Sequence, residues 1–394
     1  MTSSHNYVRL VKLKLRIRIL ETIIDCKYFP ECTGCTWIGK PYSWQQSQML
    51  ESLKIALDEA ELKVLTPFGF RATQPYQLRD RADLTLERSQ EGLTQIGFYN
   101  KTKNLVNIKE CRIFSPKLQS WYEWILDNPP PIVEKGSFRI RVGEDDLKGL
   151  WLDFSNKDIK ALIEEKKWLT EVLKQAVVEV GQRQKQMVLN KGELKLVKKA
   201  QPQNWFKTYS YPNYDSINLK SLVSSFTQPS IDANKVLIQT VCEALENIKP
   251  KNTLELFSGI GNLTIPLVSL GSFVSCYEVD KNAIRSFEQT LKDYKYDNFI
   301  KLYQKNLYSK SVEISWEEFD LLVVDPPRSG LKNFTDKIEP DNKPKNILYV
   351  SCFLNSLIED LKKLSSLGYK IQSVSGVDQF PQSSHCEWVV LLES

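Results

Sequence analysis

The stretch of sequence that decides the fold is L-E-L-F-S-G-I-G-N-L-T, residues 254–264. Its apolar start is typical of a buried strand, and Gly259 and Gly261 let the chain turn tightly where that strand passes into a helix. The next apolar run ends at Glu278, where an acidic side chain accepts hydrogen bonds from ribose hydroxyls in nucleoside-binding sheets. A nicotinamide dinucleotide and S-adenosylmethionine both fit this pattern. The missing third glycine of the dinucleotide motif favours S-adenosylmethionine.

The sequence around this stretch predicts the fold class. From about residue 216 onward, short apolar runs alternate with helical stretches, as in buried parallel strands joined by crossover helices. We therefore predict that residues 216–394 form an α/β domain, a doubly wound Rossmann-like sheet, with strands at 253–257, 273–277, 320–324 and 346–351. Residues 26–215 are rich in short alternating runs broken by turn residues, which predicts an antiparallel α+β domain. One amphipathic helix is predicted at 43–64, starting at a Ser43 cap, and is a candidate to pack against the C-terminal domain.

Reactive side chains are expected at one edge of the predicted sheet. The run L-L-V-V-D-P-P-R-S-G (321–330) places Asp325 at the carboxyl end of a buried strand, where open α/β sheets bind ligands. Cys352 likewise follows the end of the next apolar run. Most cysteines flanked by apolar residues are small core residues, and Cys242 and Cys276 are interpreted in that way. Cys352 differs because it lies past a strand end, beside the expected cofactor and Asp325.

Together with a terminal motif, these segments resemble the RNA uracil-C5 methyltransferase family over nearly the whole chain. Glu387 directly precedes the last apolar run, a position where a carboxylate alone is usually a solvated strand end. The family signatures are a strand ending F-x-G-x-G-N/T, an acidic strand end, D-P-P-R, V-S-C, a terminal F-P-Q-x-x-H-x-E and an earlier S-F-x-Q. This sequence has them, respectively, at Phe257–Asn262, Glu278, Asp325–Arg328, Val350–Cys352, Phe380–Glu387 and Ser225–Gln228.

The resemblance implies S-adenosylmethionine as cofactor and RNA as substrate. It implies that Cys352 is the nucleophile, that Glu387 is the general base, and that S-adenosylmethionine contacts Gln228, Phe257, Asn262, Glu278, Asn306 and Asp325. The chemistry agrees independently, because carbon 5 of uracil is too weak a nucleophile to attack a sulfonium methyl unaided. A thiolate that adds at carbon 6 creates an enolate with negative charge on carbon 5, and a carboxylate can later remove the carbon 5 proton. The base must leave its stack, so a flipped or loop uridine is expected.

A second group of cysteines lies near the N-terminus. Cys26-x5-Cys32-x2-Cys35 and the distant Cys111 offer four thiolates, which suit zinc or an iron–sulfur cluster, and spacing alone does not choose. Four unrelated buried thiols are the remaining alternative. In the rRNA-modifying branch of the resembled family, this spacing and a fourth cysteine in a segment like E-C-R-I-F-S-P (110–116) hold a [4Fe–4S] cluster. The resemblance therefore implies a structural cluster and favours 23S rRNA, since the tRNA-specific branch generally lacks these cysteines.

Charge and hydropathy set limits on the partners. The chain has 394 residues and a formal net charge of +5, which permits a polyanionic partner without demanding one. No apolar run approaches the roughly 20 residues that cross a bilayer, and the basic N-terminus lacks the apolar core of a signal peptide. We expect a cytoplasmic monomer with no membrane or DNA partner.

Basic residues suggest where RNA binds. Residues 11–19 alternate apolar and basic side chains, which predicts a strand that either contacts RNA or is a solvated edge. Only 25 residues precede Cys26, fewer than the N-terminal RNA-binding barrel of many family members needs. Further RNA contacts are expected from Arg79, Arg81, Lys101 and Lys103, although each alone is typical of a solvated surface charge.

Three other functions compete with rRNA methylation. The nearest is tRNA uracil-C5 methylation. An iron–sulfur redox protein on a nucleotide-binding fold would have no need of a Cys352–Glu387 pair. A non-catalytic RNA-binding protein is disfavoured because both of these residues are present.

Overall fold

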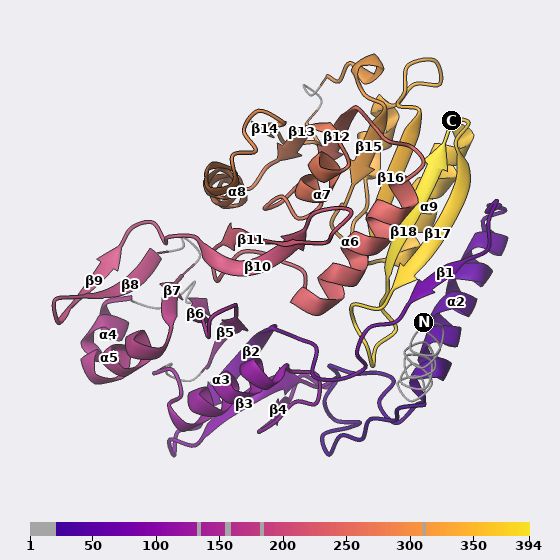
Figure 1. Cartoon of the computed structure of the whole chain (residues 1–394). Coiled ribbons are helices and arrows are strands. Elements are labelled where there is room, and N and C mark those ends of the chain that lie inside the picture. Colours follow the sequence, from indigo (N-terminus) through magenta and orange to yellow (C-terminus); the bar gives the residue numbers. More distant parts are fainter. Residues whose placement is uncertain (1–20, 132–134, 154–158, 182–184, 310–312) are drawn as a thin grey trace, which may run out of the picture.

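The computed structural model describes residues 21–131, 135–153, 159–181, 185–309 and 313–394. The strand predicted at 11–19 lies outside the described residues. Within them, the chain forms an N-terminal sheet, then a two-stranded hairpin, then most of a C-terminal sheet (Figure 1). The hairpin consists of β10 (Gln203–Tyr209) and β11 (Ser216–Ser221). No helix in the described part of the chain is both long enough and apolar enough to cross a membrane.

The C-terminal sheet contains the stretch at 254–264. Its described strands, in spatial order, are β1 (Gly69–Arg71), β17 (Lys370–Val377), β18 (Glu387–Glu393), β16 (Asn346–Ser351), β15 (Leu321–Val324), β12 (Asn252–Leu256), β13 (Phe273–Glu278) and β14 (Ile300–Gln304). Strands β12 to β16 pair in parallel, whereas β18 is antiparallel to both β16 and β17. The predicted Rossmann-like α/β sheet is confirmed, and each of its four predicted strands lies within one residue of its expected bounds.

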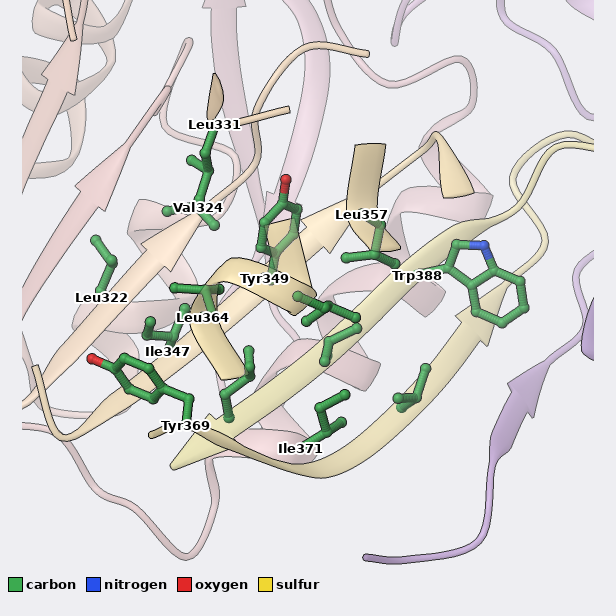
Figure 2. Packing of buried hydrophobic residues seen from close by; sticks show 14 of the residues in the cluster. Leu322, Val324, Leu331, Ile347, Tyr349, Leu357, Leu364, Tyr369, Ile371 and Trp388 are labelled. Atoms are coloured by element: carbon green, nitrogen blue, oxygen red, sulfur yellow. The ribbon is translucent and has the colours of Figure 1, made fainter. Parts of the chain in front are cut away.

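Helices cover both faces of this sheet because its central strands are apolar on both sides. In β15, Leu322 and Val324 pack into one core cluster, and Leu321 and Val323 pack into the other. Figure 2 shows the first cluster, in which Tyr349 of β16 lies among aliphatic side chains from the neighbouring elements. The first cluster is covered by α2 (Tyr42–Glu59), α9 (Leu354–Ser366) and the 3₁₀ helices Trp316–Glu318 and Lys332–Lys337. The second is covered by the hairpin, α6 (Ile231–Leu245), α7 (Thr264–Ser269) and α8 (Lys281–Tyr294).

The helix predicted at 43–64 is shorter than expected, and its predicted cap is wrong. Helix α2 begins after Pro41, without a side-chain cap, and ends at Glu59. Glu61 takes a φ of 55°, and the N–H of Leu62 donates to the carbonyl of Leu57 at 2.9 Å, which closes the last turn. The chain then runs beside β17, where β1 pairs in parallel. The residues after Glu59 have a helical pattern of apolar side chains, but their backbone groups bond to β17 instead of continuing the helix.

The N-terminal sheet packs one face on helices and leaves the other face polar. Its described strands, in spatial order, are β4 (Leu105–Asn107), β3 (Thr94–Tyr99), β2 (Arg81–Arg88), β5 (Lys135–Val142), β6 (Lys148–Asp153), β7 (Val177–Val180), β8 (Lys185–Asn190) and β9 (Glu193–Val197). Strands β6 and β7 pair in parallel, and the other described neighbours are antiparallel. The apolar face is covered by α3 (Pro116–Asp127), α4 (Ile159–Glu164) and α5 (Lys166–Gln175).

Candidate active site

The structure gathers six of the predicted functional side chains at one edge of the C-terminal sheet. This is the edge where the parallel strands end and where β18, running the other way, begins. In chain order the six are Phe257 just after β12, Glu278 ending β13, Asn306 after β14, Asp325 just after β15, Cys352 just after β16 and Glu387 starting β18. Open α/β sheets bind their ligands at this edge.

The glycine-rich loop turns sharply over the end of β13. Phe257 has a φ of 62°, an uncommon conformation for a side chain with a Cβ, and its N–H donates to the carbonyl of Tyr277 at 2.9 Å. Gly261 has a φ of 88°, and a Cβ there would lie 2.2 Å from the ring of Phe287. At Gly259, by contrast, a Cβ would meet nothing within 4 Å. The loop therefore packs tightly at one glycine and presents its backbone to open space at the other, as a nucleoside site requires.

Glu278 is held firmly beside that open space. One carboxylate oxygen accepts a hydrogen bond from the N–H of Gly259 at 2.9 Å, and the other accepts from Val279 and Asp280 at 2.7 Å each. These bonds leave a lone pair for a ribose hydroxyl on the oxygen that accepts from Gly259. Asn306 is exposed nearby, since the adjacent N–H of Lys305 donates to the carbonyl of Glu278 at 2.9 Å. The geometry fits the ribose end of a nucleoside cofactor.

Asn262 has a partner that the sequence did not reveal. Its side-chain amide exchanges two hydrogen bonds with Asn234 in α6, at 2.7 and 2.8 Å. Asn262 is thus used to join the glycine-rich loop to α6, which limits what its side chain can offer a cofactor. Gln228 is buried and lies just before Ser230, whose hydroxyl caps α6 by accepting from the N–H of Ala233 at 3.3 Å.

The predicted nucleophile and base are brought together by strand pairing. Ser351 of β16 is directly opposite Trp388 of β18, so Cys352 and Glu387 leave their strands side by side. Glu387 is 2% exposed, and Cys352 is partly buried. Burial raises the pKa of the Cys352 thiol to about 11, and the neighbouring charges of Glu387 and Asp325 add to the rise.

The carboxyl groups beside the thiol also hold protons more tightly than usual. Burial raises the pKa of Glu387 well above its ordinary value, and the charge of Asp325 raises it further. Burial likewise raises the pKa of Asp325. The guanidinium of Arg328 acts in the other direction and lowers the pKa of Cys352. The sequence points to Arg328 only through its place in the D-P-P-R motif.

We expect this environment to be visible in the reactivity of the thiol. Because the pKa of Cys352 is raised to about 11, its thiolate fraction in the free protein should still be climbing in mildly alkaline solution. Alkylation of Cys352 by iodoacetamide should then rise roughly tenfold for each pH unit between about pH 7 and about pH 9. Mass spectrometry of the Cys352 peptide measures this rate, with a small free thiol as control. A rate that levels off near neutral pH would contradict the raised pKa.

The four N-terminal cysteines line a single cavity. Cys26, Cys32, Cys35 and Cys111 are free thiols around a space of about 70 Å³, with Arg79 also in its wall. Burial and the neighbouring thiols raise the pKa of Cys35 to about 12. Across the described ranges, no three His, Cys, Asp or Glu side chains are arranged to hold a metal ion. The thiols are therefore gathered around one space without forming a ready site for a single ion.

The four basic residues expected to contact RNA are placed differently from one another. Lys101 and Lys103 are exposed in the turn between β3 and β4. Arg81 is partly buried and donates to the carbonyl of Thr227 at 3.0 Å, while Arg79 lines the cysteine cavity. Arg81 is thus engaged within the protein, and the two lysines are exposed where a polyanion can reach them.

Most of the chain is similar in sequence to known RNA methyltransferases. The family described as tRNA (Uracil-5-)-methyltransferase matches residues 43–394. An "uncharacterized RNA methyltransferase" of Bdellovibrio bacteriovorus is 34% identical over 381 residues, which cover 94% of this chain and 96% of the relative. The 23S rRNA (uracil(1939)-C(5))-methyltransferase RlmD of a Marinomonas species is 26% identical over 386 residues, covering 94% and 80% respectively.

One solved structure shares the fold over nearly the full length. It is the crystal structure of the Pyrococcus abyssi tRNA (uracil-54, C5)-methyltransferase in complex with S-adenosyl-L-homocysteine. The two superpose with a TM-score of 0.65 at 20% sequence identity, covering 95% of this chain and 92% of the other. At that identity the likeness establishes the fold.

Proposed function

Because the chain belongs to the tRNA (uracil-5-)-methyltransferase family, we propose that it methylates a uridine of 23S rRNA through a covalent adduct of Cys352. The protein is an RNA uracil-C5 methyltransferase that uses S-adenosylmethionine. The observation that carries the proposed mechanism is the pairing of β16 with β18, which sets Cys352 beside the buried Glu387. Both lie at the sheet edge that also carries the glycine-rich loop.

The proposed reaction consists of addition, methyl transfer and elimination. The Cys352 thiolate adds to carbon 6 of the uracil, and the negative charge of the resulting enolate resides on carbon 5. S-adenosylmethionine supplies an electrophilic methyl group, which carbon 5 takes up as S-adenosylhomocysteine departs. Glu387 then removes the proton from carbon 5, the double bond re-forms, and the Cys352 thiolate is expelled. The raised pKa of Glu387 suits it to this task, because its carboxylate is a stronger base than an exposed one.

Two observations support 23S rRNA as the substrate. The four cysteines share one cavity, and the sequence pattern they form resembles the rRNA-modifying branch of the family. The RlmD relative, which modifies 23S rRNA, aligns over 94% of this chain. The competing substrate is tRNA, which the family description itself names. Methyl transfer from labelled S-adenosylmethionine to separate 23S rRNA and tRNA transcripts decides between them: we expect label in the rRNA alone, and label in tRNA alone would reassign the substrate.

We place the RNA across both sheets. The proposed organisation is an RNA-binding module at 26–215 and a methyltransferase domain at 216–394, with α2 and β1 packed into the latter. Lys101 and Lys103 are the proposed phosphate contacts, because they are exposed on a turn of the N-terminal sheet. Replacing both with glutamine should weaken RNA binding and reduce its salt dependence, while leaving cofactor affinity unchanged.

We further propose that the cysteine cavity holds a [4Fe–4S] cluster. The donor set is all thiol, which suits iron–sulfur clusters as well as zinc. The four thiols line one cavity, which is compatible with either group, and the resemblance of their sequence pattern to the rRNA-modifying branch of the family favours the cluster. Bound there, it would tie residues 26–35 to Cys111 and take no part in methyl transfer.

The cluster proposal predicts a coloured protein. Anaerobically purified protein should contain iron and sulfide and absorb broadly near ~400 nm. Replacing Cys111 with serine should remove that absorbance and destabilise the residues around the cavity, while Cys242→Ser, in the buried face of α6, should keep it. Stoichiometric zinc without iron would rule the cluster out.

The role of Glu278 can be tested through cofactor affinity. We expect Glu278→Ala to weaken S-adenosylmethionine binding by about 1–3 kcal/mol, because ribose hydroxyls lose a charged acceptor and the Gly259 N–H loses its partner. Glu288→Ala, an exposed carboxylate on the neighbouring α8, is the matched control and should bind normally. Calorimetry measures both variants. Unchanged affinity in Glu278→Ala would remove this residue from the cofactor site.

A further inference from the structure

The segment that joins β11 to α6 is held in place by the other sheet. This segment, residues 222–230, carries Gln228, one of the proposed cofactor contacts. It has no regular secondary structure, so its backbone groups need partners other than a helix or strand ladder. Several of those partners are charged side chains of the N-terminal sheet.

Three arginines donate to the segment's oxygen atoms. Arg141 donates to the carbonyl of Leu222 at 2.8 Å and to the hydroxyl of Thr227 at 2.6 Å. Arg139 donates through one nitrogen to the carbonyls of Ser224 at 2.6 Å and Ser225 at 3.1 Å. Arg81 completes the set through the carbonyl of Thr227 at 3.0 Å.

A buried carboxylate receives the segment's amides. Glu179 of β7 accepts from the N–H of Val223 at 2.7 Å and from the N–H of Ser224 at 3.0 Å. It also accepts from the Ser224 hydroxyl at 2.7 Å. The N-terminal sheet therefore supplies both hydrogen-bond donors and acceptors to the segment, and we call Arg81, Arg139, Arg141 and Glu179 the charged cradle.

The cradle follows from strand alternation. Across the β2–β5 pair, Arg81 lies directly opposite Arg141, and Asp83 lies directly opposite Arg139. These two pairs therefore project from one face of the sheet. The alternate residues of these strands project from the other face into the apolar core. A charged face that is largely covered by protein is costly unless every charge is paired or hydrogen bonded. Arg141 is 2% exposed, so this part of the face contacts the segment and not solvent.

The held segment has an unusual surface. Phe226 is 71% exposed although its neighbours Ser225 and Thr227 are buried, and the Arg81 guanidinium lies 5.3 Å from the centre of its ring. The cradle holds the backbone on both sides of Phe226, through the carbonyl of Ser225 and the carbonyl of Thr227, next to Gln228.

We propose that Arg139, Arg141 and Glu179 are positioning residues that hold segment 222–230 in its cofactor-binding conformation. The N-terminal sheet thereby contributes to cofactor affinity without touching the cofactor. The inference rests on the proposed role of Gln228 at the cofactor site. Cofactor binding by Gln228 then depends on charged residues of the sheet that is proposed to bind RNA.

The test compares two cradle variants with a matched arginine on the same sheet. Arg139→Gln and Glu179→Gln each remove part of the cradle, whereas Arg88→Gln removes a partly buried arginine of β2 whose partners are Thr94 and Pro130. We expect the dissociation constant and the KM for S-adenosylmethionine to rise about tenfold in the cradle variants. At saturating cofactor, kcat should stay within about twofold of wild type, as expected when binding rather than chemistry is lost. Hydrogen exchange at the amides of Val223 and Ser224 should accelerate.

A conservative replacement of Arg139 provides a further test. Arg139→Lys keeps the charge and one donor and should recover part of the affinity; it also replaces Arg139→Gln if the glutamine variant does not fold. Cradle variants that bind the cofactor as wild type does, or that lose no more affinity than Arg88→Gln, would overturn the inference. Wild-type protein that failed to bind S-adenosylmethionine would instead overturn the proposed function.

Discussion

Replacing Cys352 with alanine is expected to lower the rate of methyl transfer by about four orders of magnitude or more. The thiol is the only group proposed to activate the pyrimidine. Without addition at carbon 6, carbon 5 carries no enolate charge and cannot take up the methyl group. Cofactor affinity should be unchanged, because Cys352 is not proposed to bind S-adenosylmethionine. The measurement is transfer of labelled methyl to RNA in a single turnover.

A buried cysteine elsewhere in the same domain supplies the control. Cys242 is fully buried in α6 and packs in the second core cluster, away from the sheet edge. Cys242→Ala should cost some stability, because it leaves a small cavity, and should retain methyl transfer. If Cys352→Ala still methylated uracil, the nucleophile would have to be found elsewhere.

Replacing Glu387 with glutamine should stop the reaction at a later stage. Adduct formation and methyl uptake need only the thiol and the cofactor, so both should proceed. The final elimination needs a base for the carbon 5 proton, and glutamine is not one. Methylated RNA should therefore remain attached to Cys352, and a denaturing gel should show a slowly migrating band that carries labelled methyl.

Strand β18 offers a matched control for this variant. Glu393 is at the other end of the strand, partly exposed, with Lys345 as its ion-pair partner at 3.9 Å. Glu393→Gln should turn over normally and show no covalent band. Normal turnover in Glu387→Gln would assign the base to another group, and Asp325 would be the first to examine because its charge is felt at both Cys352 and Glu387.

Much of the catalytic edge is predictable because short, continuous stretches of sequence determine where its residues lie. Apolar runs of strand length mark the parallel strands, and parallel strands in one sheet end at one edge. A residue just after each run, such as Asp325 or Cys352, is therefore placed without knowing the order of the strands. The glycines of the 254–264 stretch were likewise readable, since a tight turn with positive φ restricts the residue type at its own position.

The remainder depends on contacts between distant segments, which leave little trace in local sequence. The pairing of Asn234 with Asn262 joins two ordinary polar residues. The end of α2 at Glu59 is decided by β17, which lies some three hundred residues later in the chain. The sequence predicts Arg81 to be an RNA contact or a solvated surface charge, yet in the structure it donates to the carbonyl of Thr227. A charged residue looks the same in sequence whether its partner is water, RNA or a distant backbone carbonyl.

The most direct test of the account is the mass of the protein after reaction with RNA that contains 5-fluorouridine. Fluorine at carbon 5 leaves no removable proton, so the adduct cannot resolve after methyl transfer. Digestion should yield the peptide containing Cys352 joined to one methylated fluorouridine nucleotide, formed only when S-adenosylmethionine is present. An adduct on any other cysteine, or active enzyme that forms no adduct at all, would contradict methylation through Cys352.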